Sequence, residues 1–264
     1  MIYREIALPD SLRAVALCAW QFVIEAKDPP SFPHQVPPDG AAGLVLTRAP
    51  DGSLHARLLG PALAAFTVPV AQGFDYVGLR LRPEMARQVM GTPPLPGTVD
   101  QVALDGPFAP VWRDLAALIA GACDWRGAIA MFGGIVPGDA AVAGAVDHLI
   151  ASGGAVPVAR LAADAGLSER QFRRRFHAAT GVAPKQYADV QRVRRALILA
   201  LDDPDWAAVA HDSGFADQPH LIRDVKQRFG AAPRRVAGYF GGMQHELLDL
   251  PDGRNIQARP ANAA

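Results

Sequence analysis

The chain has 264 residues, half of them hydrophobic and a fifth charged, and its formal net charge at neutral pH is zero. It contains no apolar run near the roughly 18–20 residues of a membrane-spanning helix and no signal-peptide pattern at its start, so we expect a cytoplasmic protein without a membrane partner. Two cysteines, Cys18 and Cys123, are too few for a disulfide framework or a thiolate zinc site.

The first half of the chain shows the two-residue period of half-buried strands. Apolar residues alternate with others in 43–47, in 54–58 and in 77–81, and turn-forming Pro, Gly and Asp residues bound these runs. We therefore predict a β-rich, barrel-like domain with closing helices over residues 1–132.

Helical signals follow the strands. A proline in the first turn favours a short helix over 83–90, and apolar residues at helical spacing predict another over 112–119. The stretch 133–138 is rich in Gly and Pro, so we place the linker between two domains there. Beyond it, Asp139 is a helix cap, and only helices and turns follow to residue 240. The sequence thus predicts an α+β fold whose second domain, over 139–240, is all-α.

The charge is distributed unevenly between these parts. Residues 1–137 have a net charge of −2, whereas residues 138–240 have a net charge of +3. A surplus of this size is weak evidence for a polyanionic partner, so the placement of the charges matters more. The last stretch, 241–264, lacks periodicity and is predicted to be a disordered tail.

The helical part contains two copies of one pattern, offset by 48 residues and, after one inserted residue, by 49. Each copy has a helix with a small alanine, a glycine, an apolar residue, a polar helix with an apolar i, i+4 pair, and then Gly and Pro. The first copy consists of Ala162, Gly166, Leu167, Phe172, Phe176, Gly181 and Pro184, and the second of Ala210, Gly214, Phe215, Leu221, Val225, Gly230 and Pro233.

This pattern is typical of a helix-turn-helix unit. The alanine lets a second helix cross closely, and the glycine ends the first helix in a left-handed conformation. Ser168 and Asp217 are suited to cap the second helices, which can enter a major groove. A predicted helix over 184–201 would be about 27 Å long, comparable with the roughly 34 Å between successive major-groove faces.

The polar faces of the second helices carry groups that can read DNA. Arginine can grip guanine edges or phosphates, and glutamine can pair with adenine. The alternative is that both faces are simply solvated surfaces of a helical bundle. The first helix exposes Glu169, Arg170, Gln171, Arg173, Arg174 and Arg175, and the second exposes Gln218, His220, Arg223 and Lys226.

Residues 138–240 resemble the DNA-binding domain of the AraC/XylS family of bacterial transcription regulators. The resemblance implies two helix-turn-helix units joined by a long helix, with promoter DNA and RNA polymerase as partners and a location at the nucleoid. It places base contacts on Arg170, Gln171, Arg173, Arg174, Gln218, Pro219, His220 and Arg223. Phosphate contacts are predicted at Ser168, Arg175, Lys185, Arg192, Arg194, Arg195, Asp217 and Lys226.

The second unit departs from the family pattern. Pro219 stands where a small hydroxyl residue is usual, and Leu221 and Val225 stand where aromatics are usual. Ile222 replaces a typically polar residue, and Val236 replaces a common tyrosine. We therefore expect the first unit, with its arginine-rich helix, to dominate sequence reading.

The amino-terminal part resembles a poorly described β-rich sensor region of some AraC-like regulators, through the segments 37–40, 60–61 and 78–83. The resemblance implies a sensing or dimerising module and names no effector. The candidate effector-binding residues are Trp20, Phe22, Phe66, Tyr76 and Arg80. Simple core packing of the aromatic residues and solvation of the arginine are the alternatives.

No catalytic or metal-binding pattern accompanies these residues. His34 and His55 lack the neighbouring ligands of a metal site, and there is no phosphate-binding glycine loop, nucleophile elbow or Ser-His-Asp arrangement. We expect no cofactor and no enzymatic activity. Two alternatives remain open at this point: a small-molecule-binding or catalytic β-barrel with an accessory helical domain, and a β-domain that serves only for dimerisation.

Overall fold

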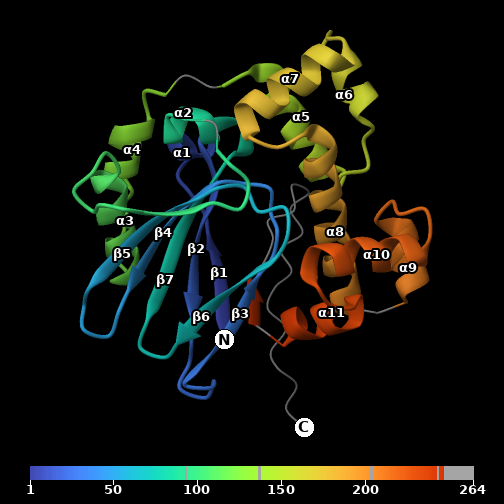
Figure 1. Ribbon diagram of the computed structural model, residues 1–264. Coiled ribbons are helices and arrows are strands. Elements are labelled where there is room, and N and C mark those ends of the chain that lie inside the picture. Colours follow the sequence, from blue (N-terminus) through green and yellow to red (C-terminus); the bar gives the residue numbers. More distant parts are fainter. Residues whose placement is uncertain (93, 136–137, 203–204, 243, 247–264) are drawn as a thin grey trace.

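Strands dominate the first hundred residues of the computed structural model, which describes residues 1–92, 94–135, 138–202, 205–242 and 244–246. The larger sheet has the order β8 (Val99–Val102), β5 (Leu54–Leu59), β4 (Gly43–Arg48), β7 (Asp75–Leu81), β2 (Ala16–Val23), β1 (Ile2–Ile6) and β9 (Gln244–Glu246). A separate sheet pairs β3 (Ser31–Val36) with β6 (Phe66–Ala71). Figure 1 shows both sheets beside the carboxy-terminal helices.

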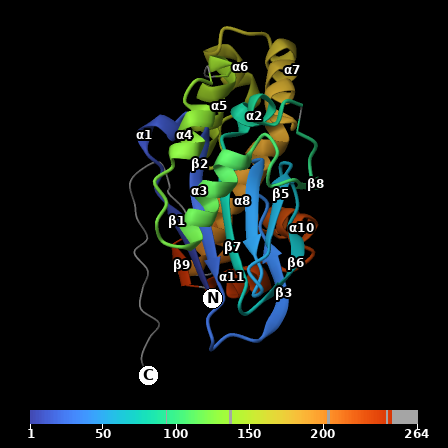
Figure 2. The ribbon, with the colours of Figure 1, turned by 90° about the vertical axis from the view of Figure 1, so that its left-hand side faces the viewer.

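Alternation along the central strands gives the larger sheet one dry face. Leu44 and Leu46 of β4 and Val77 and Leu79 of β7 are fully buried in a core that also contains Trp112. Helices cover this face, as Figure 2 shows. They are α1 (Asp10–Arg13), α3 (Ala109–Ile119) and α4 (Arg126–Phe132), and a 3₁₀ turn (Pro83–Met85) leads into the short α2 (Ala86–Met90).

The strands do not close into a barrel among the described residues, which corrects the barrel-like shape expected from the sequence. The two-stranded sheet of β3 and β6 instead lies apart from the larger sheet. β9, formed by residues 244–246, pairs in parallel with β1, although the sequence predicts a disordered tail there. The rest of that predicted tail, residues 247–264, lies outside the described residues.

The helical part follows the predicted repeat closely. The first unit consists of α6 (Val158–Asp164) and α7 (Glu169–Thr180), and the second of α9 (Trp206–Asp212) and α10 (Gln218–Phe229). The 19-residue helix α8 (Pro184–Asp202) joins them, α5 (Ala140–Ala151) precedes them, and α11 (Pro233–Gly241) follows them.

The helices begin and end at the capping residues and glycines that the sequence indicates. The side chains of Asp139, Ser168 and Asp217 each accept a hydrogen bond from a backbone N–H group in the first turn of the next helix. Gly166 and Gly214 end the first helices of the two units with φ values of 65° and 77°, a conformation that favours glycine.

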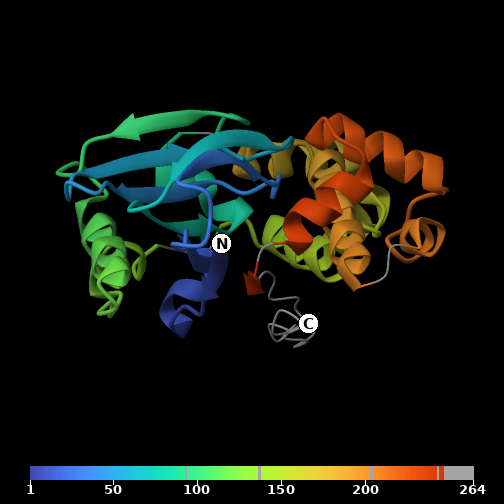
Figure 3. The same cartoon turned by 90° about the horizontal axis from the view of Figure 1, so that it is seen from below.

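The two parts share a core. Phe22 of β2 and Val70 of β6 belong to the same buried cluster as Leu221 and Phe240 of the helical part. Figure 3 shows the sheets and the carboxy-terminal helices lying side by side. The Gly- and Pro-rich linker therefore joins a β-rich part and a helical part that pack against each other.

Candidate nucleic-acid interface and ligand cavity

Helix α7 has a dry face and a charged face. Phe172 and Phe176 are fully buried, with ring centroids 5.8 Å apart, and Phe176 lies 6.0 Å from the ring of Tyr187 on α8. This packing turns the polar residues outward. Those exposed on α7 are Glu169, Arg170, Gln171, Arg173, Arg174, Arg175 and, in its last turn, His177.

The four exposed arginines of α7 differ in their partners. Arg173 pairs with Glu169 at 2.8 Å, and Arg175 donates from Nη2 to Asp139 at 2.6 Å. Although partial burial alone would raise the pKa of Asp139, the hydrogen bond from Arg175 lowers it. Arg170 and Arg174 make no ion pair or hydrogen bond within the described part of the chain, so their guanidinium groups are available to an outside partner.

Helix α10 is anchored in the same way, but its outer face offers fewer arginines to DNA. Leu221 and Val225 are fully buried, as the repeat predicts. His220 is only half-exposed, because its ring packs edge-on against Phe215 with centroids 5.2 Å apart. The exposed predicted residues of this unit are Asp217, Gln218, Pro219, Arg223 and Lys226.

The residues predicted to contact phosphates are mostly engaged within the protein. Lys185 pairs with Asp189 at 2.9 Å. On α8, Arg192, Arg194 and Arg195 each donate to a backbone carbonyl, at 3.2, 3.5 and 3.2 Å. Arg192 also lies 5.6 Å from the ring centroid of Phe215. The phosphate roles of these residues stay a prediction.

Ser168 stabilises the start of α7 through a capping box. Its hydroxyl accepts from the backbone N–H of Gln171, whose side chain accepts in turn from the backbone N–H of Ser168. We expect Ser168→Ala to lower the free energy of unfolding by about 1 kcal/mol, whereas Ser168→Asp keeps an acceptor and should lose less. Urea denaturation measures both, and an alanine variant as stable as the natural chain would contradict the capping role.

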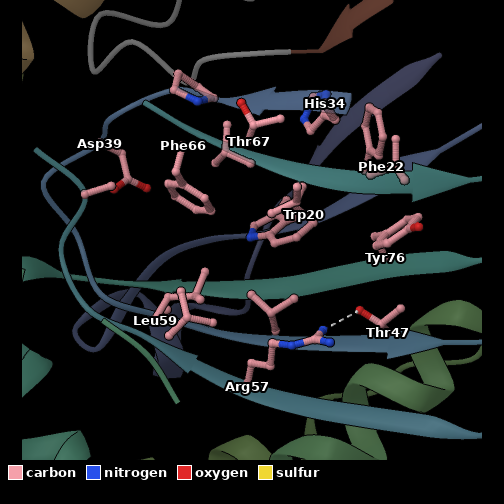
Figure 4. A pocket seen from close by; sticks show the side chains of 18 of the residues that line it. Trp20, Phe22, His34, Asp39, Thr47, Arg57, Leu59, Phe66, Thr67 and Tyr76 are labelled. Carbon is pink, nitrogen blue, oxygen red and sulfur yellow. Dashed lines mark hydrogen bonds between the residues drawn. The ribbon is translucent and has the colours of Figure 1, made fainter. Parts of the chain in front are cut away.

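A cavity of about 770 Å³ lies on the second face of the larger sheet, between it and the strands β3 and β6. Phe240 of α11 also lines it. Figure 4 shows aromatic side chains from both sheets around this space. All five candidate effector residues belong to its lining: Trp20, Phe22, Phe66, Tyr76 and Arg80.

Small residues on the central strands leave the room for this cavity. Gly78 of β7 faces Trp20 of β2 across one strand pair and Val45 of β4 across the other. A Cβ atom at Gly78 would lie 2.5 Å from the indole ring, so only glycine lets Trp20 lie flat on the sheet. At the neighbouring pair, Gly43 of β4 likewise has no side chain to fill the space.

The two arginines of the cavity have different surroundings. Arg80 pairs with Glu5 at 2.9 Å and with Asp39 at 3.0 Å, and its Nη2 donates to the hydroxyl of Tyr3. Its positive charge is therefore balanced inside the protein. Arg57 of β5 makes only a long hydrogen bond of 3.4 Å to Thr47, and it has no ion pair with any described residue.

Arg57 is a functional candidate that is absent from the residues predicted from the sequence. Arg57 and Val45 are partners across β5 and β4, which places Arg57 on the cavity face two positions from Leu59. The alternation of 54–58 indicates which face Arg57 occupies, because Leu54, Ala56 and Leu58 point to the opposite face of the sheet. Nothing in the sequence distinguishes it from an ordinary solvated arginine.

The described residues contain no group of three or more His, Cys, Asp or Glu side chains that could hold a metal ion. His34 instead hydrogen-bonds through Nδ1 to the hydroxyl of Tyr239 at 2.9 Å. None of the helices within the described ranges is long and apolar enough to cross a membrane.

Two family models match the chain. A helix-turn-helix domain matches residues 161–238, and a domain of unknown function matches residues 4–100. No curated protein matches the chain in sequence.

Several solved structures are similar to parts of the chain. The DNA-binding domain of AdpA, a global transcriptional factor solved in complex with a target DNA, is 33% identical over 38% of this chain and 89% of its own, with a TM-score of 0.32. An AraC-type transcriptional regulator from Chromobacterium violaceum is 24% identical over 38% of this chain and 90% of its own, with a TM-score of 0.35. ToxT from Vibrio cholerae is 8% identical over 90% of this chain and 99% of its own, with a TM-score of 0.46.

Proposed function

Because this chain belongs to the AraC-type helix-turn-helix proteins through residues 161–238, we propose that it is a sequence-specific DNA-binding transcription regulator and not an enzyme. Its partners in this proposal are double-stranded promoter DNA, RNA polymerase and a small-molecule effector, and it acts at the nucleoid. The proposed division is a sensing domain over 1–132 and a DNA-binding domain over 139–240.

The observation that carries the proposal is the face of α7. Arg170 and Arg174 are exposed and unpaired within the described residues, on a capped helix whose opposite face is anchored by two buried phenylalanines. An unbalanced pair of arginines on a rigid helix suits guanine edges and phosphates.

The second unit supports a bipartite reader with unequal halves. At 1.5 Å per residue, the 19 residues of α8 span about 28 Å, close to the separation of successive major-groove faces. Helix α10 exposes one arginine, Arg223, and its His220 is partly committed to Phe215. We therefore assign most of the sequence discrimination to α7.

The cavity lies where a bound molecule would touch the DNA-binding part. Phe240 lines the cavity, and its ring lies 6.0 Å from that of Phe229, the last residue of α10. Tyr239 is tied to β3 through His34, and Arg228 donates to the carbonyl of Leu63 at 2.7 Å. A small molecule in the cavity would thus bear on the packing of α10 and α11, and this is how we propose that DNA binding is controlled.

Mapping of bound DNA across a bacterial genome, followed by titration of the recovered sites, tests the DNA-binding proposal. We expect a preferred sequence with two adjacent segments, and an association constant whose logarithm falls linearly with the logarithm of salt concentration, by about 0.9 for each phosphate neutralised. Equal affinity for recovered and scrambled duplexes would overturn the proposal.

A further inference from the structure

We infer that the cavity takes an amphipathic monoanion, a small molecule with one acid group held by Arg57 and an apolar body lying against the aromatic residues. This inference deepens the proposed effector control and rests on it for its biological meaning. The binding chemistry itself follows from the cavity.

The charges that face the cavity leave one cation unbalanced. Its lining contains Arg57, Arg80 and one carboxylate, Asp39. Asp39 is already paired with Arg80, which also pairs with Glu5. Arg80 therefore has two carboxylate partners, and Arg57 has none among the described residues. Arg57 is partly exposed and has no carboxylate partner among the described residues, so an acid group on a ligand would give it the charge-assisted hydrogen bonds that it lacks.

The surroundings of Arg57 are suited to an apolar ligand body. Across the sheet, Arg57 is followed in one row by Val45, Gly78 and Trp20. The row beside it contains His55, Thr47, Tyr76 and Phe22. Figure 4 shows Arg57 on the same side of the sheet as Trp20 and Tyr76, with Phe66 facing them from β6. The acid group would lie at one end of a largely aromatic floor.

The size of the cavity limits the ligand. About 770 Å³ falls within the roughly 300–1,000 Å³ of sites for single small molecules. One free guanidinium also matches one negative charge, whereas a nucleotide or another polyanion would need more cations than the described lining offers. The indole nitrogen of Trp20 lies over Gly78 on the same floor and is a second donor.

Two dyes of similar shape and different charge test this inference on the full chain. They are the monoanion 1-anilinonaphthalene-8-sulfonate and neutral N-phenyl-1-naphthylamine, followed by fluorescence titration. We expect Arg57→Met to raise the dissociation constant of the anionic dye by roughly tenfold and to leave that of the neutral dye unchanged. The matched control is Arg48→Met on the same sheet, since Arg48 pairs with Asp75 and does not line the cavity.

A second variant ties the dyes to the cavity. Val45→Phe fills the floor beside Arg57 and should weaken both dyes. Unchanged binding of the anionic dye in Arg57→Met, an equal loss of both dyes there, or no effect of Val45→Phe would each overturn the inference. Titration of the same variants with DNA in the absence of dye separates the two proposals. A loss of anionic-dye binding alone in Arg57→Met supports the ligand inference, whether or not the chain binds DNA.

Discussion

Arg170→Ala and Arg174→Ala should each weaken binding to a cognate duplex by about 1–3 kcal/mol, which corresponds to roughly 5- to 150-fold in affinity. Both side chains are exposed and have no ion pair or hydrogen bond within the described residues, so their removal costs the free protein nothing inside the fold. Fluorescence anisotropy with the mapped site and with single-base variants of it measures the loss and shows which bases each arginine reads.

The neighbouring arginines provide a graded comparison. Arg173 must leave Glu169 to reach DNA, so Arg173→Ala should cost less than Arg174→Ala. Arg113→Ala is the matched charge control, because Arg113 is exposed on α3, which covers the sheet face away from the helix-turn-helix units. If Arg113→Ala weakened binding as much as Arg174→Ala, the effect would be one of net charge, and α7 would lose its assignment as the reading helix.

The helical units were predictable because their determinants are local. A cap such as Ser168 acts on an amide three residues away, and Gly166 satisfies a backbone angle of its own. The buried pair of each second helix is set by spacing alone. A duplicated local pattern therefore fixes both copies, and the sequence indicates the caps, the glycines and the buried faces of α7 and α10.

The cavity was only partly predictable, because it depends on which strands become neighbours. The aromatic candidates are visible in the sequence, but the partners of the two arginines are not. Arg80 finds Glu5, 75 residues earlier in the chain, whereas Arg57 finds no carboxylate among the described residues. Strand order therefore decides which cation is free, and the residues predicted from the sequence include the balanced Arg80 and not the free Arg57.

The contact between the two parts was not predictable either. A Cβ atom on Gly40 would lie 2.7 Å from the ring of Tyr187, so this turn of the β-part sits directly on helix α8. Arg194 donates to the carbonyl of Pro38 in the same turn. Sequence periodicity predicts that Tyr187 lies on the buried face of a helix. It does not indicate that residues near position 40 cover its ring.

Phe176→Ala should lower the free energy of unfolding by about 3–5 kcal/mol, the largest effect on stability that we expect from one substitution in the helical part. The ring is fully buried between Phe172 and Tyr187, and its loss leaves a space that the rigid helices α7 and α8 cannot fill by collapsing. Urea denaturation followed by circular dichroism measures the loss. Phe176→Leu keeps most of the volume and is the matched control.

The equivalent position in the second unit makes this a test of how unequal the two units are. Val225 is also fully buried, but Val225→Ala removes fewer carbon atoms and should cost only about 1–2 kcal/mol, at about 0.8 kcal/mol for each buried methylene. If Val225→Ala proved as destabilising as Phe176→Ala, the second unit would be packed as firmly as the first, and its smaller expected share in DNA reading would have to come from its surface residues alone.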